Sequence, residues 1–171
     1  AGVSRKTFYE LFKDKEEALL TAYIGNELLI DAIIGAAAER ARTSGATATD
    51  LIAAGARGML QTLADAPAFT RTFFIEALGA GPRVRERRDA AIEQLAAAIG
   101  PLLLALQAAE QPDQPPIDHD LVRGLIGACT DAVIRHLVHH EPQTLGQLEP
   151  TLTKLTRRLV CAVVDDVRPS G

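Results

Sequence analysis

The stretch AGVSRKTFYELFKDKE, residues 1–16, carries most of the information about this fold. Gly2 supplies a turn conformation that is costly for other residues, and Ser4 is a typical N-cap for a short helix. Asp14 is followed three residues later by Glu17, which is close to a capping box. The pattern predicts a turn, a short helix and then the start of a second helix.

The short helix has two chemically different faces. Val3, Phe8 and Phe12 fall on one side and form the packing face. Guanidinium, ammonium and hydroxyl donors on the other side can contact base edges and phosphates; these are Arg5, Lys6, Thr7 and Tyr9. A solvated amphipathic helix with a few cations gives the same pattern, so spacing alone leaves both interpretations open.

Residues 1–16 resemble the recognition helix and following junction of TetR-family transcriptional repressors. The resemblance covers about a tenth of the chain. It implies that Arg5 and Lys6 contact bases, that Thr7 and Tyr9 contact phosphate or thymine methyl groups, and that Lys15 contacts backbone phosphate.

The chain departs from the family pattern in two ways. Glu10 places an anion in the helix that would face DNA, where it would repel phosphate. Family members also carry two helices before the recognition helix, and these are not in this sequence. If the chain begins at Ala1, we expect no specific DNA binding; if such residues precede it in the protein, the repressor interpretation stands.

The composition indicates an all-α protein of one compact domain. Hydrophobic residues make up 47% of the 171 residues but aromatic residues only 4%, with no Trp, so Leu, Ala, Ile and Val must form the core. Apolar residues recur at three- and four-residue spacing, without strand-like alternation. Together with the resemblance, this predicts part of a helix-turn-helix DNA-binding domain at residues 1–15 and a TetR-like ligand-binding and dimerisation domain at residues 16–171.

Start and stop signals divide the chain into helices. Thr47 with Asp50, and later Asp118, are N-cap signals, and Thr144 with Gln147 has the form of a capping box. We expect Pro150 in the first turns of the last helix, or splitting it. The predicted helices cover residues 4–12, 14–42, 47–64, 66–78, 82–111 with a kink at Gly100-Pro101, 118–140 and 144–167.

Charge and cysteine usage limit the function classes. The formal net charge is -4, but residues 1–15 hold four cations against two anions, so any DNA-binding surface is confined to this end. Cys129 and Cys161 match no metal or redox spacing, which is typical of free thiols in a reducing cytosol. We find no apolar run of membrane-span length and no signal pattern, and expect a cytoplasmic protein without membrane contact.

The resemblance implies a small effector bound among the helices behind the DNA-binding head. Gly55 and Gly58 leave space on one helix, and the surrounding residues carry few polar groups, which favours an apolar effector. Any of these residues can instead be ordinary core. The candidate ligand-binding residues are Met59, Thr62, Phe69, Phe73, Phe74, Leu125 and Cys129.

The last two long helices carry apolar stripes that suit a four-helix bundle between two copies, as the family uses. A two-fold dimer would place two recognition helices on the half-sites of a palindromic operator. In a monomer the same stripes would belong to a single core. The candidate interface residues are Leu121, Leu125, Val133, Leu137, Leu152, Leu155, Leu159 and Val163.

Other polar clusters have simpler interpretations. His136 and His140 are one helical turn apart, as in some metal sites, but with His139 they also suit the negative end of a helix dipole. The arginines at 83, 85, 87 and 88 are accompanied by Glu86 and Asp89 and are typical of a solvated face. The sequence has no phosphate-binding loop, nucleophile elbow or paired carboxylates, so we expect neither an enzyme nor a cofactor.

The sequence therefore predicts a ligand-responsive repressor. An apolar effector in the helical core would release a homodimer from a palindromic site on double-stranded DNA. The alternative is a helical small-molecule-binding or interaction protein that does not bind DNA.

Overall fold

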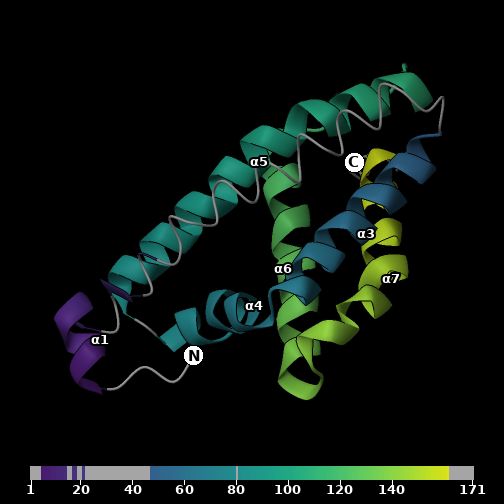
Figure 1. The fold of residues 1–171 in the computed structure, drawn as a ribbon. Helices are drawn as coiled ribbons and strands as arrows, with labels where there is room; N and C mark the ends of the chain where they lie inside the picture. Colours follow the sequence, from purple (N-terminus) through teal and green to yellow (C-terminus); the bar gives the residue numbers. More distant parts are fainter. Residues whose placement is uncertain (1–4, 15–16, 19–20, 22–46, 80, 162–171) are drawn as a thin grey trace, which may run out of the picture.

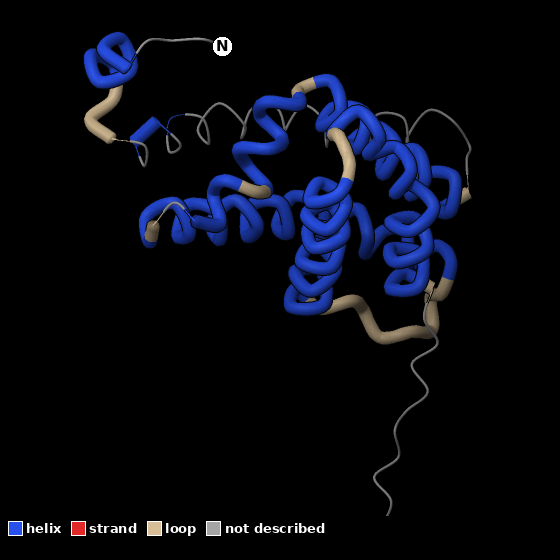
Figure 2. Tube along the Cα trace, turned by 90° about the horizontal axis from the view of Figure 1, so that it is seen from below, coloured by secondary structure: helices blue, strands red, loops and turns tan. Residues whose placement is uncertain are grey.

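The computed structural model describes residues 5–14, 17–18, 21, 47–79 and 81–161. These residues form six α-helices and two 3₁₀ helices and contain no strand, which confirms the predicted all-α fold (Figures 1 and 2). The elements are α1 (Arg5–Leu11), α3 (Ala48–Asp65), α4 (Pro67–Phe74), η1 (Glu76–Gly79), α5 (Pro82–Glu110), α6 (His119–His139), η2 (Pro142–Leu148) and α7 (Glu149–Val160).

Three helices, α3, α6 and α7, lie side by side and form the body of the molecule (Figure 1). The long helix α5 crosses α6 and extends well beyond this body, while α4 packs between the end of α3 and α6. Helix α1 lies toward the amino end of α5, away from α3, α6 and α7 (Figures 1 and 2).

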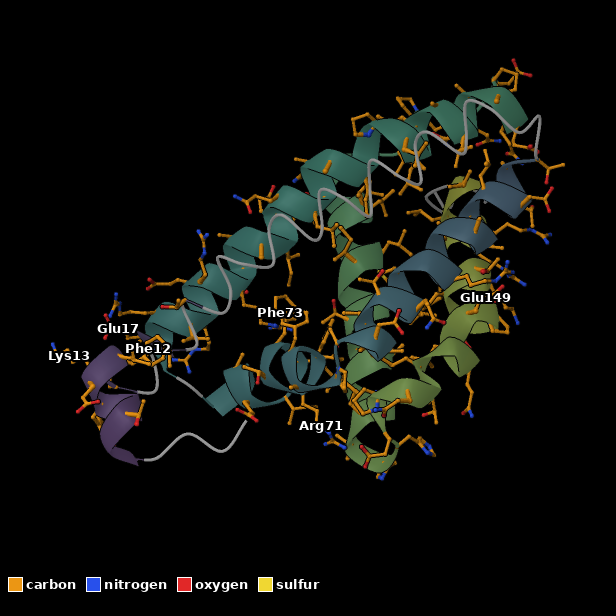
Figure 3. All side chains as sticks on the ribbon, in the orientation of Figure 1. Phe12, Lys13, Glu17, Arg71, Phe73 and Glu149 are labelled. Carbon is orange, nitrogen blue, oxygen red and sulfur yellow. The ribbon has the colours of Figure 1, made fainter. Side chains whose placement is uncertain are left out.

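The amino-terminal signals are largely confirmed. The short helix is present as α1, and the Asp14 carboxylate accepts a hydrogen bond from the Glu17 N–H at 2.8 Å. In a complete capping box the Glu17 carboxylate would accept a hydrogen bond from the Asp14 N–H. Here it accepts instead from the N–H of the preceding residue, Lys13, at 2.6 Å (Figure 3). Most of the predicted helix at 14–42 lies outside the described residues.

The N-cap signals of two body helices are also confirmed. The Thr47 hydroxyl accepts from the Asp50 N–H at 3.2 Å, and the Asp50 carboxylate accepts from the Thr47 N–H at 3.1 Å, which completes a capping box on α3. The Asp118 carboxylate accepts from the Leu121 N–H at 2.8 Å at the start of α6. These bonds satisfy backbone donors that have no partner within the helix.

Two other predictions about the helices were wrong. The expected helix at 66–78 is divided into α4 and the 3₁₀ helix η1. Thr144 forms no capping box, because its hydroxyl donates to the Glu141 carbonyl at 2.7 Å. The last helix begins at Glu149, with Pro150 in its first turn, where a missing N–H costs no hydrogen bond.

The buried apolar residues form two clusters, both of which include residues of α3 and α6. We name them the first cluster and the second cluster. The first consists of Ala48, Ile52, Ala96, Leu103, Leu106, Ile117, Val122, Ile126 and Val160. The second consists of Leu60, Leu63, Phe74, Val133, Leu137, Leu145 and Leu152.

A buried amide fixes the loop between α5 and α6 beside the first cluster. The Gln107 side chain donates to the Pro115 carbonyl at 3.0 Å and accepts from the Ile117 N–H at 2.9 Å. Both hydrogen-bonding ends of the amide are therefore satisfied, as buried polar groups require. The predicted loop at 111–116 is thus held against α5.

Helix α5 is apolar and long enough to cross a membrane by the criteria of length and composition, contrary to the expectation from sequence. These two criteria alone are weak evidence, since a mostly buried core helix can also meet them, but only 17% of the apolar window of α5 is buried. In this structure α5 packs against α6 and contributes Ala96, Leu103 and Leu106 to the first cluster.

Candidate ligand-binding cavity

A cavity of about 240 Å³ lies between the two clusters. Its wall combines first-cluster residues such as Ile52 and Ile126 with second-cluster residues such as Leu63 and Val133. The described residues of the wall come from α3, α4, α5, α6 and α7. Movement of any of these helices would therefore change the shape of the cavity.

Most of the predicted ligand-binding residues do line this space; they are Met59, Phe69, Phe73, Phe74, Leu125 and Cys129. Thr62 does not, because its hydroxyl donates to the Gly58 carbonyl at 2.9 Å and it is not part of the wall. Gly55 lines the cavity as expected, whereas Gly58 does not.

The sequence analysis missed the wall that α5 provides. This wall carries apolar residues at helical spacing: Ile92, Leu95, Ile99, Leu102, Leu103 and Leu106. The spacing was visible in the sequence as an amphipathic pattern. The sequence did not show which helices the apolar face of α5 packs against, because periodicity identifies a buried face but not its neighbour.

Three phenylalanine rings form the aromatic part of the wall. The centroids of Phe69 and Phe73 are 5.5 Å apart, and Phe73 and Phe74 form an edge-to-face pair at 4.9 Å. Figure 3 shows Phe73 extending from α4 toward α5. The Thr70 hydroxyl is buried and donates to the Leu63 carbonyl at 2.7 Å, which fixes α4, and hence the rings, to the end of α3.

The polar groups on the described wall are few and uncharged. They are the thiol of Cys129 and the hydroxyls of Thr130 and Thr156. Burial raises the pKa of the Cys129 thiol to about 11. The thiol is therefore almost entirely protonated at neutral pH, which makes it a slow nucleophile and a poor metal ligand.

An unfilled space of this size has an energetic cost. Apolar side chains of its wall, such as Phe73, Leu95 and Ile99, are only partly buried and so keep apolar surface in contact with solvent. A bound apolar molecule would recover part of that free energy through burial and dispersion contacts. The cavity is thus the best candidate for a binding site in the described residues.

Comparison with known proteins identifies no relative of this chain. No family model, curated protein or solved structure matches this chain. The resemblance to TetR-family repressors therefore stays a prediction, and it depends on residues 1–16 and the all-α fold.

The predicted DNA-binding residues lie at the end of the molecule that holds α1. Tyr9 is 63% exposed and Thr7 is half-buried. The side chains of Arg5, Lys6 and Lys15 lie outside the described part of the structure. Glu10, the departure from the family pattern, is exposed.

The predicted dimer interface needs correction. Val133, Leu137 and Leu152 are buried inside the single chain in the second cluster, so they are core residues and cannot form an accessible seam. Leu125 faces the cavity, and Leu159 packs against the first cluster. Val163 lies outside the described residues.

Two residues of the predicted interface do remain accessible. Leu121 on α6 is 50% exposed and Leu155 on α7 is 37% exposed. Val138 on α6, which the sequence analysis did not select, is 61% exposed. The exposed face of α6 at helical spacing consists of Leu121, Gly124, Ala128, Asp131, Arg135 and Val138, so a charged pair interrupts its apolar residues.

The histidines at the end of α6 hold η2 in place. His136 is buried, and its Nε2 lies 2.8 Å from the Thr144 hydroxyl. Because that hydroxyl donates to the Glu141 carbonyl, it accepts from His136, which places the ring proton on Nε2. Among the described residues, no three His, Cys, Asp or Glu side chains are placed to hold a metal ion.

We predict that this histidine makes stability depend on pH. Burial, and secondarily the charge of His140, lowers the pKa of His136 below its ordinary value of 6.5. The unfolded chain therefore binds the proton first, and stability is lost as the pH falls from about 6.5 toward the folded-state pKa. Urea unfolding from pH 8 to pH 5 should show this loss.

The control for this prediction is a variant pair. His136→Gln should reduce the pH dependence in that window, whereas His139→Gln, at an exposed position, should leave it unchanged. Equal pH dependence in His136→Gln and the unaltered protein would contradict the assignment.

The arginines at the amino end of α5 do not form an evident anion site. Arg83 and Arg85 are exposed and Arg87 is half-buried, as expected for a largely solvated face. Arg88 has a buried Nε without a hydrogen-bond partner. We have no physical account of that atom.

Proposed function

We propose that this chain is the ligand-sensing and dimerising part of a DNA-binding transcriptional repressor of the TetR type. The observation that carries the proposal is the apolar cavity of about 240 Å³ at the junction of five helices in an all-α body. The resemblance of residues 1–16 to a recognition helix supplies the DNA-binding element. An apolar effector would be the signal, and the protein is expected in the cytoplasm.

The position of the cavity supports a coupling mechanism. Its wall includes both α5 and α4, and α5 extends from the cavity to the end of the molecule where α1 lies (Figure 1). A ligand that favours one packing of these helices shifts the population toward it. In a dimer, that shift would change the separation of the two recognition helices and weaken operator binding.

The exposed stripe on α6 supports a homodimer. Leu121 is a large apolar side chain in solvent, and Gly124 and Ala128 next along the helix are small enough to let a second helix approach closely. The exposed ion pair between Asp131 and Arg135, at 2.6 Å, separates this segment from the exposed Val138. Leu155 on α7 is also exposed. We propose that this surface meets its own copy across a two-fold axis.

Operator binding tests the proposal. The protein, expressed with any residues that precede residue 1 in its gene, should shift a palindromic fragment from DNA adjoining that gene. Arg5→Ala should weaken this specific binding by about 1–3 kcal/mol, because a bidentate contact to a guanine would be lost. A mobility shift at several salt concentrations measures both affinity and sequence preference.

A matched control is Arg57→Ala, which removes a surface cation from α3, where Arg57 pairs with Glu149 at 3.0 Å. This variant should bind the operator like the unaltered protein. Unchanged operator affinity and sequence preference in Arg5→Ala would show that Arg5 has no such role.

The alternative function is a small-molecule-binding protein that does not bind DNA. The net charge of -4 and the exposed Glu10 favour it. Binding to DNA that is independent of sequence and lost at moderate salt would support this alternative over the repressor.

A further inference from the structure

The two threonines of the cavity wall lie at the same level of two neighbouring helices. Helices α6 and α7 run in opposite directions beside each other (Figure 1). In the first cluster Ile126 of α6 accompanies Val160 of α7, and in the second cluster Val133 accompanies Leu152. Thr130 and Thr156 fall between these two levels on their helices, where the cavity separates the clusters.

The hydroxyls of these threonines are available to a ligand. Some threonines of the structure, such as Thr62 and Thr70, use their hydroxyls within the protein, whereas the buried Thr153 hydroxyl has no hydrogen-bond partner. Within the described residues, neither Thr130 nor Thr156 makes a hydrogen bond to another protein group. A hydroxyl both donates and accepts, so the pair can bind an alcohol, a carbonyl or an ester oxygen.

The rest of the described wall excludes charge. It contains no Asp, Glu, Lys, Arg or His. A carboxylate or ammonium would lose its hydration without gaining an opposite charge, which is far more costly than burying a hydroxyl that finds a partner. The raised pKa of Cys129 has the same cause, since burial there disfavours the charged thiolate.

The volume sets the size of the ligand. A dry apolar cavity of about 150 Å³ in another protein holds benzene, which has six carbon atoms. By proportion, 240 Å³ corresponds to a molecule of about ten non-hydrogen atoms. Larger drug-like molecules generally need more space than this.

From these observations we infer that the cavity binds a neutral, apolar molecule of about ten non-hydrogen atoms with one hydrogen-bonding group, which is held at the level of Thr130 and Thr156. This inference rests on the proposed ligand-sensing role of the cavity and specifies the class of the effector. Medium-chain alcohols belong to this class, whereas fatty acids and alkylamines of the same length do not.

Matched probes test the inference by calorimetry on the full chain without DNA. 1-Octanol should bind, and octanoate and octylammonium at pH 7.4 should bind at least tenfold more weakly because each carries a charge. 1-Butanol should also bind at least tenfold more weakly, since it buries four fewer methylene groups. Equal binding of octanoate and 1-octanol, or no binding of 1-octanol, would overturn the inference.

Variants test the role of the two hydroxyls. The double substitution Thr130→Val and Thr156→Val keeps the shape of the side chains, so the fold should persist, which thermal melting checks. It should weaken 1-octanol at least threefold but leave n-butylbenzene, which has no hydrogen-bonding group, unaffected. Thr151→Val, at an exposed position of α7, is the control. Parallel loss of both ligands, or of neither, would overturn the role of the hydroxyls.

A chemical measurement locates the probe. Cys129 lies on the cavity wall and Cys161 does not. Saturating 1-octanol should therefore slow maleimide labelling of Cys129 relative to Cys161, measured by peptide mass spectrometry. Equal labelling rates with and without 1-octanol would show that the alcohol binds elsewhere and would overturn the inference.

These results separate the inference from the proposed function. If 1-octanol binds as expected and the protein shows no sequence-specific DNA binding, the repressor function fails and the ligand class stands. If a charged compound instead releases the protein from an operator and 1-octanol does not bind, the ligand class fails and the repressor function stands.

Discussion

Replacing Leu60 with alanine is expected to lower the free energy of unfolding by about 2–5 kcal/mol. Leu60 is fully buried in the middle of α3 and belongs to the second cluster. The substitution removes apolar contacts and leaves a void that the surrounding helices can only partly fill. Urea denaturation followed by circular dichroism measures the change.

The neighbouring residue supplies the control for Leu60→Ala. Gln61 is exposed on the same helix and bonds only the Asp65 carboxylate, at 2.8 Å. Gln61→Ala should therefore change stability by no more than about 0.5 kcal/mol. A loss below 1 kcal/mol in Leu60→Ala would show that the second cluster is not the tightly packed unit described above.

The large effect at Leu60 follows from how the second cluster is built. The cluster joins the second half of α3 to α4, η2 and the ends of α6 and α7 that lie next to η2. The 3₁₀ helix η2 contributes Leu145, which is also fully buried. A void at Leu60 therefore weakens the contacts that hold several short elements at once.

Local signals in the sequence predicted the starts of several helices correctly. Thr47 with Asp50 and Asp118 both cap helices as expected, and Gly81, with φ of 97°, precedes Pro82 at the start of α5. Such signals succeed because the bonds they predict join residues only three positions apart. Thr144 failed because its hydroxyl donates to the Glu141 carbonyl and accepts from His136 of α6, and the second of these is a tertiary contact that no local pattern reveals.

The candidate site was only partly predictable for the same reason. The three phenylalanines, Met59 and Cys129 were placed on the cavity wall from their apolar character and helical spacing. The α5 wall was missed, and Val133 and Leu152 were assigned to a dimer seam although they are core. An apolar stripe looks the same in sequence whether its partner is in the same chain or in another.

Gly55→Phe is expected to abolish binding in the cavity while leaving the fold intact. Gly55 lies on the wall within α3, and a Cβ built at this position meets nothing within 4 Å. The phenyl ring can therefore occupy the space that a ligand would use. Calorimetry should show at least a tenfold loss of 1-octanol affinity, because the remaining volume no longer accommodates about ten non-hydrogen atoms.

Gly55→Ala separates occupation of the cavity from the effect of losing the glycine. A glycine inside a helix costs about 0.5–1 kcal/mol relative to alanine, so this variant should be more stable by that amount and still bind 1-octanol. Gly127→Ala, on α6 and away from the cavity, should show the same gain without any change in binding.

The contrast between the two Gly55 variants decides what the cavity is. If it is a defect in packing, filling it with a phenyl ring should raise stability, and the unaltered protein should have no measurable ligand affinity to lose. If it is a binding site, Gly55→Phe should gain stability and lose ligand affinity together, whereas Gly55→Ala should gain stability alone. Retained 1-octanol affinity in Gly55→Phe would place the ligand outside this cavity.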